Sequence, residues 1–131
     1  MRFQDHSNAV VQKQFVAAVF SGDHDTIRCL AHPDFALHEG SGMPFAGIYR
    51  SADGFIAFLE IFTNAFEIRK LEEVRAFMAG DPDHMAFLFE LEAILRSAGT
   101  PFVSTLAESW VFKGGKVLEI RAHYFNSPFH P

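Results

Sequence analysis

The chain has too few cysteines and too short apolar runs for several broad classes of protein. Cys29 is the one cysteine among 131 residues, so no disulfide can form within the chain, and this composition fits a reducing compartment. No apolar run approaches the roughly 20 residues that a membrane-spanning helix requires. Gln12, Lys13 and Gln14 interrupt the first apolar stretch, where a signal peptide would continue. We therefore expect a cytoplasmic protein without a membrane partner.

Basic residues are also scarce. The chain has 11 lysines and arginines against 16 acidic residues, and its net charge is −5. Arg69 and Lys70 form an isolated pair rather than the basic patch that phosphate binding needs, so we expect no nucleic-acid partner. None of the seven histidines has the paired spacing of a metal-binding motif, which predicts no metal site.

The chain is instead rich in phenylalanine, with sixteen residues. Hydrophobic residues make up 49% of the chain and the mean hydropathy is +0.08, which is typical of a globular protein. At this length, residues 1–131 are expected to form one domain with a single core. The excess of phenylalanine indicates an aromatic-lined cavity or a buried interface, and the count alone leaves both open.

The first half of the sequence has helical patterns. Ser7 is a good N-cap for a helix that runs to about Ser21, where Gly22 ends it. Asp23 is expected to cap a short second helix, with Cys29 on its apolar side, and Pro33 to close it. A strand at residues 35–39 follows.

A third helix after Ser51 has the clearest periodicity. Beyond it, strands alternate with turn signals at residues 80–83, 97–99 and 114–115, of which the last is the strongest hairpin signal. The pattern predicts an α+β domain in which three N-terminal helices pack on one face of a curved antiparallel sheet. The helical stripe consists of Phe55, Phe58, Leu59, Phe62 and Phe66, mostly as core residues, with one or two lining a pocket floor.

Two glutamates occupy positions where the strand periodicity expects apolar side chains. Glu39 is in phase with Phe35 and Leu37, and Glu108 is in phase with Trp110 on a later strand. Residues i, i+2 and i+4 share one face of a strand. A carboxylate is rarely buried without a partner or a chemical task. If both carboxyls face one cavity, at least one should titrate abnormally.

Other positions divide between the two faces of the predicted sheet. Phe89 alternates with Glu90, so it should face the interior, while Glu90 and Arg96 should lie on the outer face. Tyr124 and Asn126 share a phase that points towards the interior.

These motifs together resemble the NTF2-like superfamily over nearly the whole chain. The resemblance lies in the opening helix at residues 10–18, the Gly22-Asp23 turn, the loop that ends at Gly47, and the closing hairpin at residues 110–117. It implies a cystatin-like cone with a pocket at its open end. The superfamily includes ketosteroid isomerases, SnoaL-like polyketide cyclases and non-catalytic binding modules, so the fold alone leaves the function open.

The ketosteroid isomerases provide the nearest local match. By this resemblance, Glu39 falls at their general base and Glu108 at the acid that stays protonated to hold the oxyanion. Phe15 falls at their oxyanion-binding tyrosine and has no hydroxyl group. In the SnoaL-like cyclases a Tyr-x-Asp pattern supplies an acid/base aspartate, and here that pattern reads Tyr124-Phe125-Asn126. Asparagine can donate hydrogen bonds but cannot transfer a proton near neutral pH.

The sequence therefore predicts a protein that binds a small, largely apolar molecule. Our leading hypothesis is an isomerase or cyclase that needs no cofactor, with Glu39 and Glu108 as catalytic residues; the alternative is a non-catalytic ligand-binding or dimerisation module. The resemblance also implies a homodimer through the outer face of the sheet. The residues expected to contact the ligand are Phe15, Phe58, Phe62, Phe89, Trp110, Tyr124 and Asn126.

Overall fold

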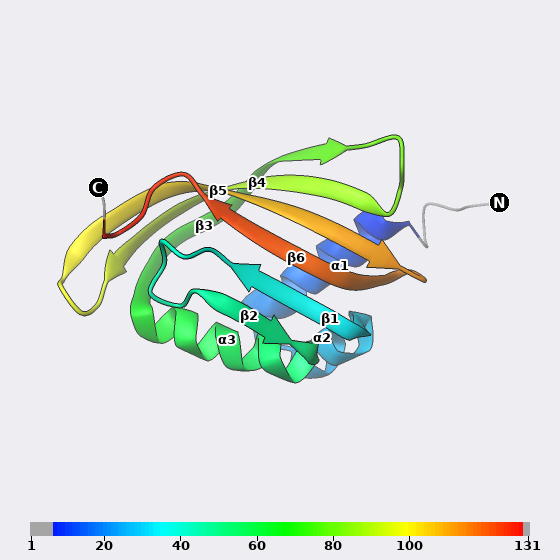
Figure 1. Cartoon of the computed structure of the whole chain (residues 1–131), viewed down its shortest axis with the longest axis horizontal. Coiled ribbons are helices and arrows are strands. Elements are labelled where there is room, and N and C mark those ends of the chain that lie inside the picture. Colours follow the sequence, from blue (N-terminus) through cyan, green and yellow to red (C-terminus); the bar gives the residue numbers. More distant parts are fainter. Residues whose placement is uncertain (1–6, 130–131) are drawn as a thin grey trace.

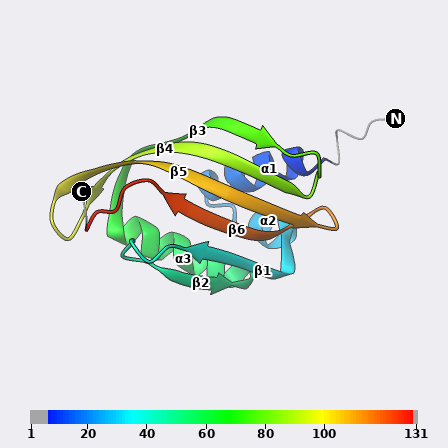
Figure 2. The ribbon, with the colours of Figure 1, turned by 45° about the horizontal axis from the view of Figure 1, so that its top comes forward.

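The computed structural model describes residues 7–129, in which helices lie beneath one strongly curved sheet (Figure 1). The six strands follow the order β2-β1-β6-β5-β4-β3 across this sheet. Figure 2 shows α3 on the side towards which the long strands curve. Among the described residues, no helix is both long enough and apolar enough to cross a membrane.

The first two helices begin and end at the residues that the sequence indicates. Helix α1 (Asn8–Ser21) is capped by the Ser7 hydroxyl, which accepts a hydrogen bond from the Val10 amide at 3.3 Å. It ends at Gly22, whose φ of 70° lies in the left-handed region that favours glycine. Helix α2 (His24–Leu30) is capped by Asp23.

Two expectations for this region were wrong. Cys29 is exposed, because α2 has only seven residues and Ile27 is the residue that it buries. Pro33 does not close the helix; it lies within β1 (Ala31–Glu39). The pairing of β1 with β6 is irregular between Ala31 and Ala36, and an irregular stretch is where a strand tolerates proline, which has no N–H to donate.

Strand β2 (Gly47–Arg50) forms an antiparallel pair with β1 and was not predicted. Helix α3 (Ser51–Ala65) begins directly after it, and the Ser51 hydroxyl accepts a hydrogen bond from the Gly54 amide at 3.4 Å. The helix buries Phe55, Phe58 and Phe62, as its periodicity predicts.

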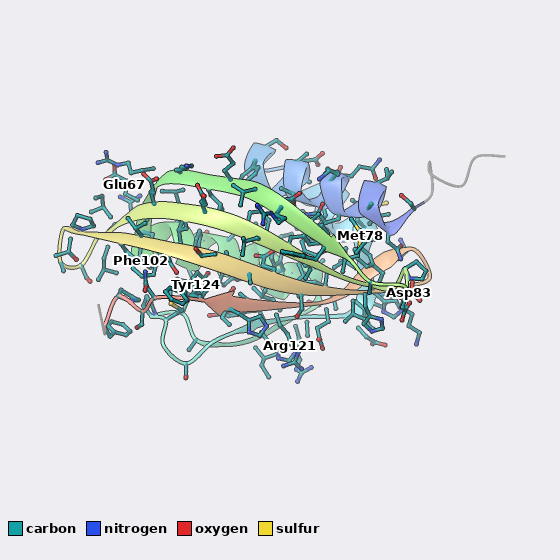
Figure 3. All side chains as sticks on the ribbon, turned by 90° about the horizontal axis from the view of Figure 1, so that it is seen from above. Glu67, Met78, Asp83, Phe102, Arg121 and Tyr124 are labelled. Carbon is teal, nitrogen blue, oxygen red and sulfur yellow. The ribbon has the colours of Figure 1, made fainter. Side chains whose placement is uncertain are left out.

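The second half of the chain is a meander of four long strands. These strands are β3 (Phe66–Met78), β4 (His84–Leu95), β5 (Thr100–Lys113) and β6 (Lys116–Tyr124). The predicted turns separate them, and each neighbouring pair is antiparallel. Figure 3, which views the sheet from above, shows Glu67 and Phe102 towards one end and Met78 and Asp83 towards the other.

The prediction of three N-terminal helices on an antiparallel sheet needs correction. Only α1 and α2 precede the sheet, because β1 and β2 come between α2 and α3. The sheet is mixed, since β1 runs parallel to β6. A parallel pair needs a long crossover connection, and here α3 and the first three strands of the meander provide it. The α+β class itself is confirmed.

Outward-facing residues agree only in part with expectation. On the outer face Lys70 binds Glu90, with Nζ–Oε1 at 2.9 Å, and also lies near Glu72 and Glu92. Arg96 does not join this group, because it follows the end of β4 and its Nε donates to the Thr63 carbonyl at 2.9 Å.

The core is built largely from phenylalanine rings in mutual contact. Phe66, with no exposed surface, stacks on Phe102 with ring centroids 5.3 Å apart and planes at 12°. It also makes edge contacts with Phe45 and Phe62. Offset and edge-to-face arrangements add to the free energy gained from burial of the rings. Phe66 therefore joins the end of α3 to the sheet.

We expect Phe66→Ala to lower the free energy of unfolding by about 3–5 kcal/mol, because it removes a buried ring and leaves a cavity. Urea-induced unfolding measures this change. The control is Met78→Ala, at a side chain that is 57% exposed, which should alter stability by less than about 0.5 kcal/mol. Equal effects of the two substitutions would contradict this account of the core.

Candidate active site: two carboxyls in an aromatic cavity

The pairing register places the two glutamates in one row across the sheet. Glu39 of β1 and Glu108 of β5 both pair with Ala122 of β6, which lies between them. Directly paired residues project from the same face of a sheet. The two backbones are thus two strand spacings apart, about 10 Å, and only a methyl group stands between the carboxyl side chains. Residues 69 positions apart in the chain therefore face the same space.

The rows on either side are apolar or aromatic. Towards one end, Ile120 pairs with both Leu37 and Trp110. Towards the other end, Tyr124 pairs with Leu106, which in turn pairs with Phe89. The carboxyl row therefore lies between two rows of large side chains on the concave face.

A cavity of about 310 Å³ lies between this face and the helices. Its lining comes from α1, α3 and five of the strands, and no lysine, arginine or histidine is among the described residues that line it. Phe20 of α1, which is 58% exposed, and the half-buried Ile68 and Leu71 of β3 mark its opening to solvent. The volume is at the small end of the range for small-molecule sites.

Glu39 is buried and incompletely hydrogen-bonded. It is 8% exposed, and its Oε1 has no hydrogen-bond partner among the described residues. Burial, followed by repulsion from Glu108, raises the pKa of Glu39 from 4.5 to about 8, and the Tyr124 hydroxyl opposes the rise. A carboxyl with this pKa is mostly protonated at neutral pH.

Glu108 is half-buried and lines the cavity. Its Oε1 accepts a hydrogen bond from the Trp110 indole Nε1 at 3.0 Å. Burial raises the pKa of Glu108 from 4.5 to about 7; the Trp110 bond lowers it, and repulsion from Glu73 adds to the rise. Trp110 thus stabilises the ionised form of Glu108, whereas Oε1 of Glu39 lacks such a donor.

Tyr124 brings a hydroxyl group to the cavity lining, whereas Phe15 has none. Burial raises the pKa of Tyr124 well above its ordinary 10, and the negative charges of Glu39 and Glu108 raise it further. The tyrosine therefore stays protonated and can donate a hydrogen bond in the cavity. Burial, followed by the charge of Glu39, also raises the pKa of Tyr49 of β2. The Tyr49 hydroxyl, however, donates to the Phe45 carbonyl at 2.7 Å.

A polar network forms around Glu73, whose charge contributes to the raised pKa of Glu108. The Nε2 of Gln12, a fully buried residue of α1, donates to Oε1 of Glu73 at 2.7 Å. Lys13 binds the other oxygen of Glu73 at 2.9 Å. The sequence did not predict this network, because the helical pattern was read from apolar residues and Gln12 is polar. Gln12 lies three residues before Phe15, and this spacing indicates that both side chains share the buried face of the helix.

The structure gathers eight of the nine predicted site residues around the cavity. These eight are Glu39, Glu108, Phe15, Phe58, Phe62, Phe89, Trp110 and Tyr124. Their catalytic and ligand-binding roles remain predictions.

Asn126 does not line the cavity. Strand β6 ends at Tyr124, so the alternation of faces stops before Asn126. Its Nδ2 donates to the Val103 carbonyl at 2.7 Å, and its backbone N–H donates to the Ser104 hydroxyl at 3.0 Å. The expectation that Asn126 faces the ligand was therefore wrong.

The carboxyl pair should make stability depend on pH. The folded chain holds these protons more tightly than the unfolded chain, so their stabilising contribution is complete below about pH 4.5 and is lost as the pH rises towards about 8. Each carboxyl adds a slope of at most about 1.4 kcal/mol per pH unit. Urea unfolding across this range should show that Glu39→Gln gains stability relative to the natural chain as the pH rises. Parallel pH profiles would contradict the assignment.

Comparison with known proteins agrees with this architecture. The family model of the SnoaL-like domain matches residues 13–120. No curated protein sequence gives a significant match. An NTF2-like protein from Burkholderia thailandensis has a TM-score of 0.79 at 20% identity, and the match covers 95% of this chain and 92% of the other.

Two further solved structures are similar. A protein with a cystatin-like fold from Xanthomonas campestris has a TM-score of 0.75 at 19% identity, with 92% of each chain covered. TerC, which was co-crystallised with polyporic acid, has a TM-score of 0.74 at 20% identity, with 89% of this chain and 90% of TerC covered. At these identities the structures show the fold, and the family match extends over most of the sequence. The chain therefore belongs to the SnoaL-like domain family, and its fold is that of the NTF2-like proteins.

Proposed function

We propose that the protein binds a small, largely apolar carbonyl compound and moves a proton next to the carbonyl group, as an isomerase or a cyclase would. One observation carries this proposal: two carboxyls with raised pKa values share one aromatic cavity. Repulsion between them favours a pair that holds a single negative charge near neutral pH, which provides one base and one acid in the same site.

The physical causes favour Glu108 as the ionised member of this pair. Its Oε1 receives the Trp110 N–H and its pKa is about 7, whereas Glu39 has an oxygen without a donor and a pKa of about 8. This distribution reverses the roles that the family resemblance implies. Glu108 would then be the base, and Glu39 the neutral acid that donates a hydrogen bond.

The proton transfer that we propose is balanced within the site. The Glu108 carboxylate takes a proton from the carbon next to the carbonyl, and the electrons of that C–H bond form the enolate double bond. The Glu39 carboxyl and the Tyr124 hydroxyl donate hydrogen bonds to the enolate oxygen. Glu108 returns the proton to a different carbon of the conjugated system, which regenerates the carboxylate and yields the isomer. Neither an oxidant nor a cofactor takes part in this step.

A non-catalytic binding module is the competing function, and Phe15 favours it. Phe15 is 1% exposed and packs edge-to-face on Trp110 with ring centroids 5.5 Å apart. Its side chain has no hydroxyl group that could donate to the oxygen of a ligand. Loss of one oxyanion donor typically costs about 100–1,000-fold in rate. In this alternative, the cavity holds a ligand and the two carboxyls orient it.

Catalysis predicts a specific pattern of variants. We expect the protein to convert a β,γ-unsaturated cyclohexenone into its conjugated isomer, measured by the rise in ultraviolet absorbance. Glu108→Gln should lower kcat/KM by about 100–10,000-fold, because it removes the base. Tyr124→Phe should cost less, since Glu39 still donates to the oxygen.

The matched control for this experiment is Glu90→Gln, at an exposed carboxyl on the outer face. It should leave the isomerisation rate unchanged. If the natural chain binds the ketone but does not isomerise it, the binding module is the correct function.

The proposed homodimer also needs a direct test. Val103 of β5 is 60% exposed and pairs with Glu92, on the outer face where Lys70 lies among three glutamates. An exposed apolar side chain beside charges of both signs supports association through this face. Light scattering should give twice the chain mass of 14.7 kDa, and Val103→Asp should reduce it to the mass of one chain. A natural chain of single mass would refute the dimer.

A further inference from the structure

We infer that the same cavity also binds small apolar ammonium ions, a class of ligand beyond the carbonyl compounds proposed above. This inference rests on the proposed function only in placing a small molecule in this cavity. It concerns the state in which the carboxyl pair is ionised, whereas the proposed proton transfer uses the state that keeps one proton.

The first argument is a missing counter-charge. Buried carboxylates are normally paired with a cation or fully hydrogen-bonded. Oε1 of Glu39 has no hydrogen-bond partner among residues 7–129, and the cavity lining within that range includes no basic side chain. Lys13 of α1 does not line the cavity, and its Nζ binds Oε2 of Glu73 at 2.9 Å. A ligand that carries a positive charge would therefore supply what the described residues do not.

The second argument is the aromatic lining. Rings from α1, α3 and three strands border the space that the carboxyls face. A cation within about 6 Å of an aromatic ring is stabilised by its quadrupole, and more strongly where water is excluded. The alkyl groups of an amine would also gain from contact with these rings. Eight aromatic residues line this space, and they include Phe15, Phe58, Phe62, Phe89, Trp110 and Tyr124.

The donor set selects an organic cation over a metal ion. Calcium takes six to eight oxygen ligands and magnesium needs a near-ideal octahedron. Two carboxyls on either side of Ala122 do not provide such a shell, and no group of three or more metal-ligating side chains occurs in the described part of the chain. An alkylated ammonium ion needs only charge and apolar contact.

The titratable groups around the site predict how this binding depends on pH. Glu39 of β1, Glu108 of β5 and Tyr124 of β6 line the cavity. Burial and then the charge of Glu39 raise the pKa of Tyr49 of β2, and the charge of Glu73 of β3 contributes to the raised pKa of Glu108. Helices α1 and α3 and strand β4 add no titratable group to the lining. A bound cation favours the ionised carboxyls, so binding should release protons and strengthen as the pH rises.

The test compares a cation with its carbon isostere. Benzyltrimethylammonium and neopentylbenzene have nearly the same shape, and only the first is charged. Trp110 is the single tryptophan of the chain and lines the cavity, so its fluorescence reports binding of either molecule. We expect the ammonium ion to bind roughly tenfold more tightly at about pH 8.5 than at about pH 6, because the pair ionises between these values. The isostere should bind with the same affinity at both.

Variants locate the effect. Glu39→Gln and Glu108→Gln should each lower affinity for the ammonium ion by about tenfold at the higher pH and change affinity for the isostere by less than about twofold. Retained binding of the isostere shows that each variant is folded. Glu90→Gln, on the outer face, should bind both molecules as the natural chain does.

The outcomes separate this inference from the proposed function. If the isostere binds as tightly as the cation at both pH values, the ammonium site is refuted. If acetophenone binds and the cation does not, the inference fails while the carbonyl site stands. If none of the three molecules alters the fluorescence of Trp110, both proposals fail.

Discussion

Two carboxyls on one sheet face, in a cavity whose described lining has no basic residue, are the constraint on which the rest of this site depends. Glu39 and Glu108 face each other across Ala122, and desolvation raises the pKa of both. Such an arrangement costs folding free energy at neutral pH, which natural proteins accept mainly at functional sites. The aromatic lining both creates this cost and makes the space suitable for an apolar ligand.

The core extends beyond the carboxyl row, although several core residues also line the cavity. Phe66, Phe102 and Phe45 pack where α3 meets the sheet, away from the carboxyl row, and the four-stranded meander provides continuous backbone hydrogen bonding. The small volume of the cavity and its two carboxyls limit the proposed ligands more tightly than the family membership does.

Several features were accessible to sequence reasoning because they are local. Capping at Ser7 and Asp23, the aromatic stripe of α3 and the glycine hairpin before β6 depend on residues close together in the chain. The wrong phase of Glu39 and Glu108 was visible for the same reason, since alternation along one strand fixes the face. Asn126 shows the limit of this method, because the alternation ended when the strand ended.

The sequence by itself determined which residues were out of place: two acids in apolar phase, and Phe15 at the position where the resemblance to ketosteroid isomerases implies a tyrosine. The tertiary structure decided that the two acids are close enough to affect each other's pKa. The parallel pairing of β1 with β6 brings together strands that are far apart in the chain, and it makes Ala122 the common neighbour of both carboxyls. The tertiary structure also decided that Trp110 donates to Glu108, while Oε1 of Glu39 has no donor among the described residues. Periodicity specifies a face, but only the register between distant strands specifies a neighbour, and a pKa depends on neighbours.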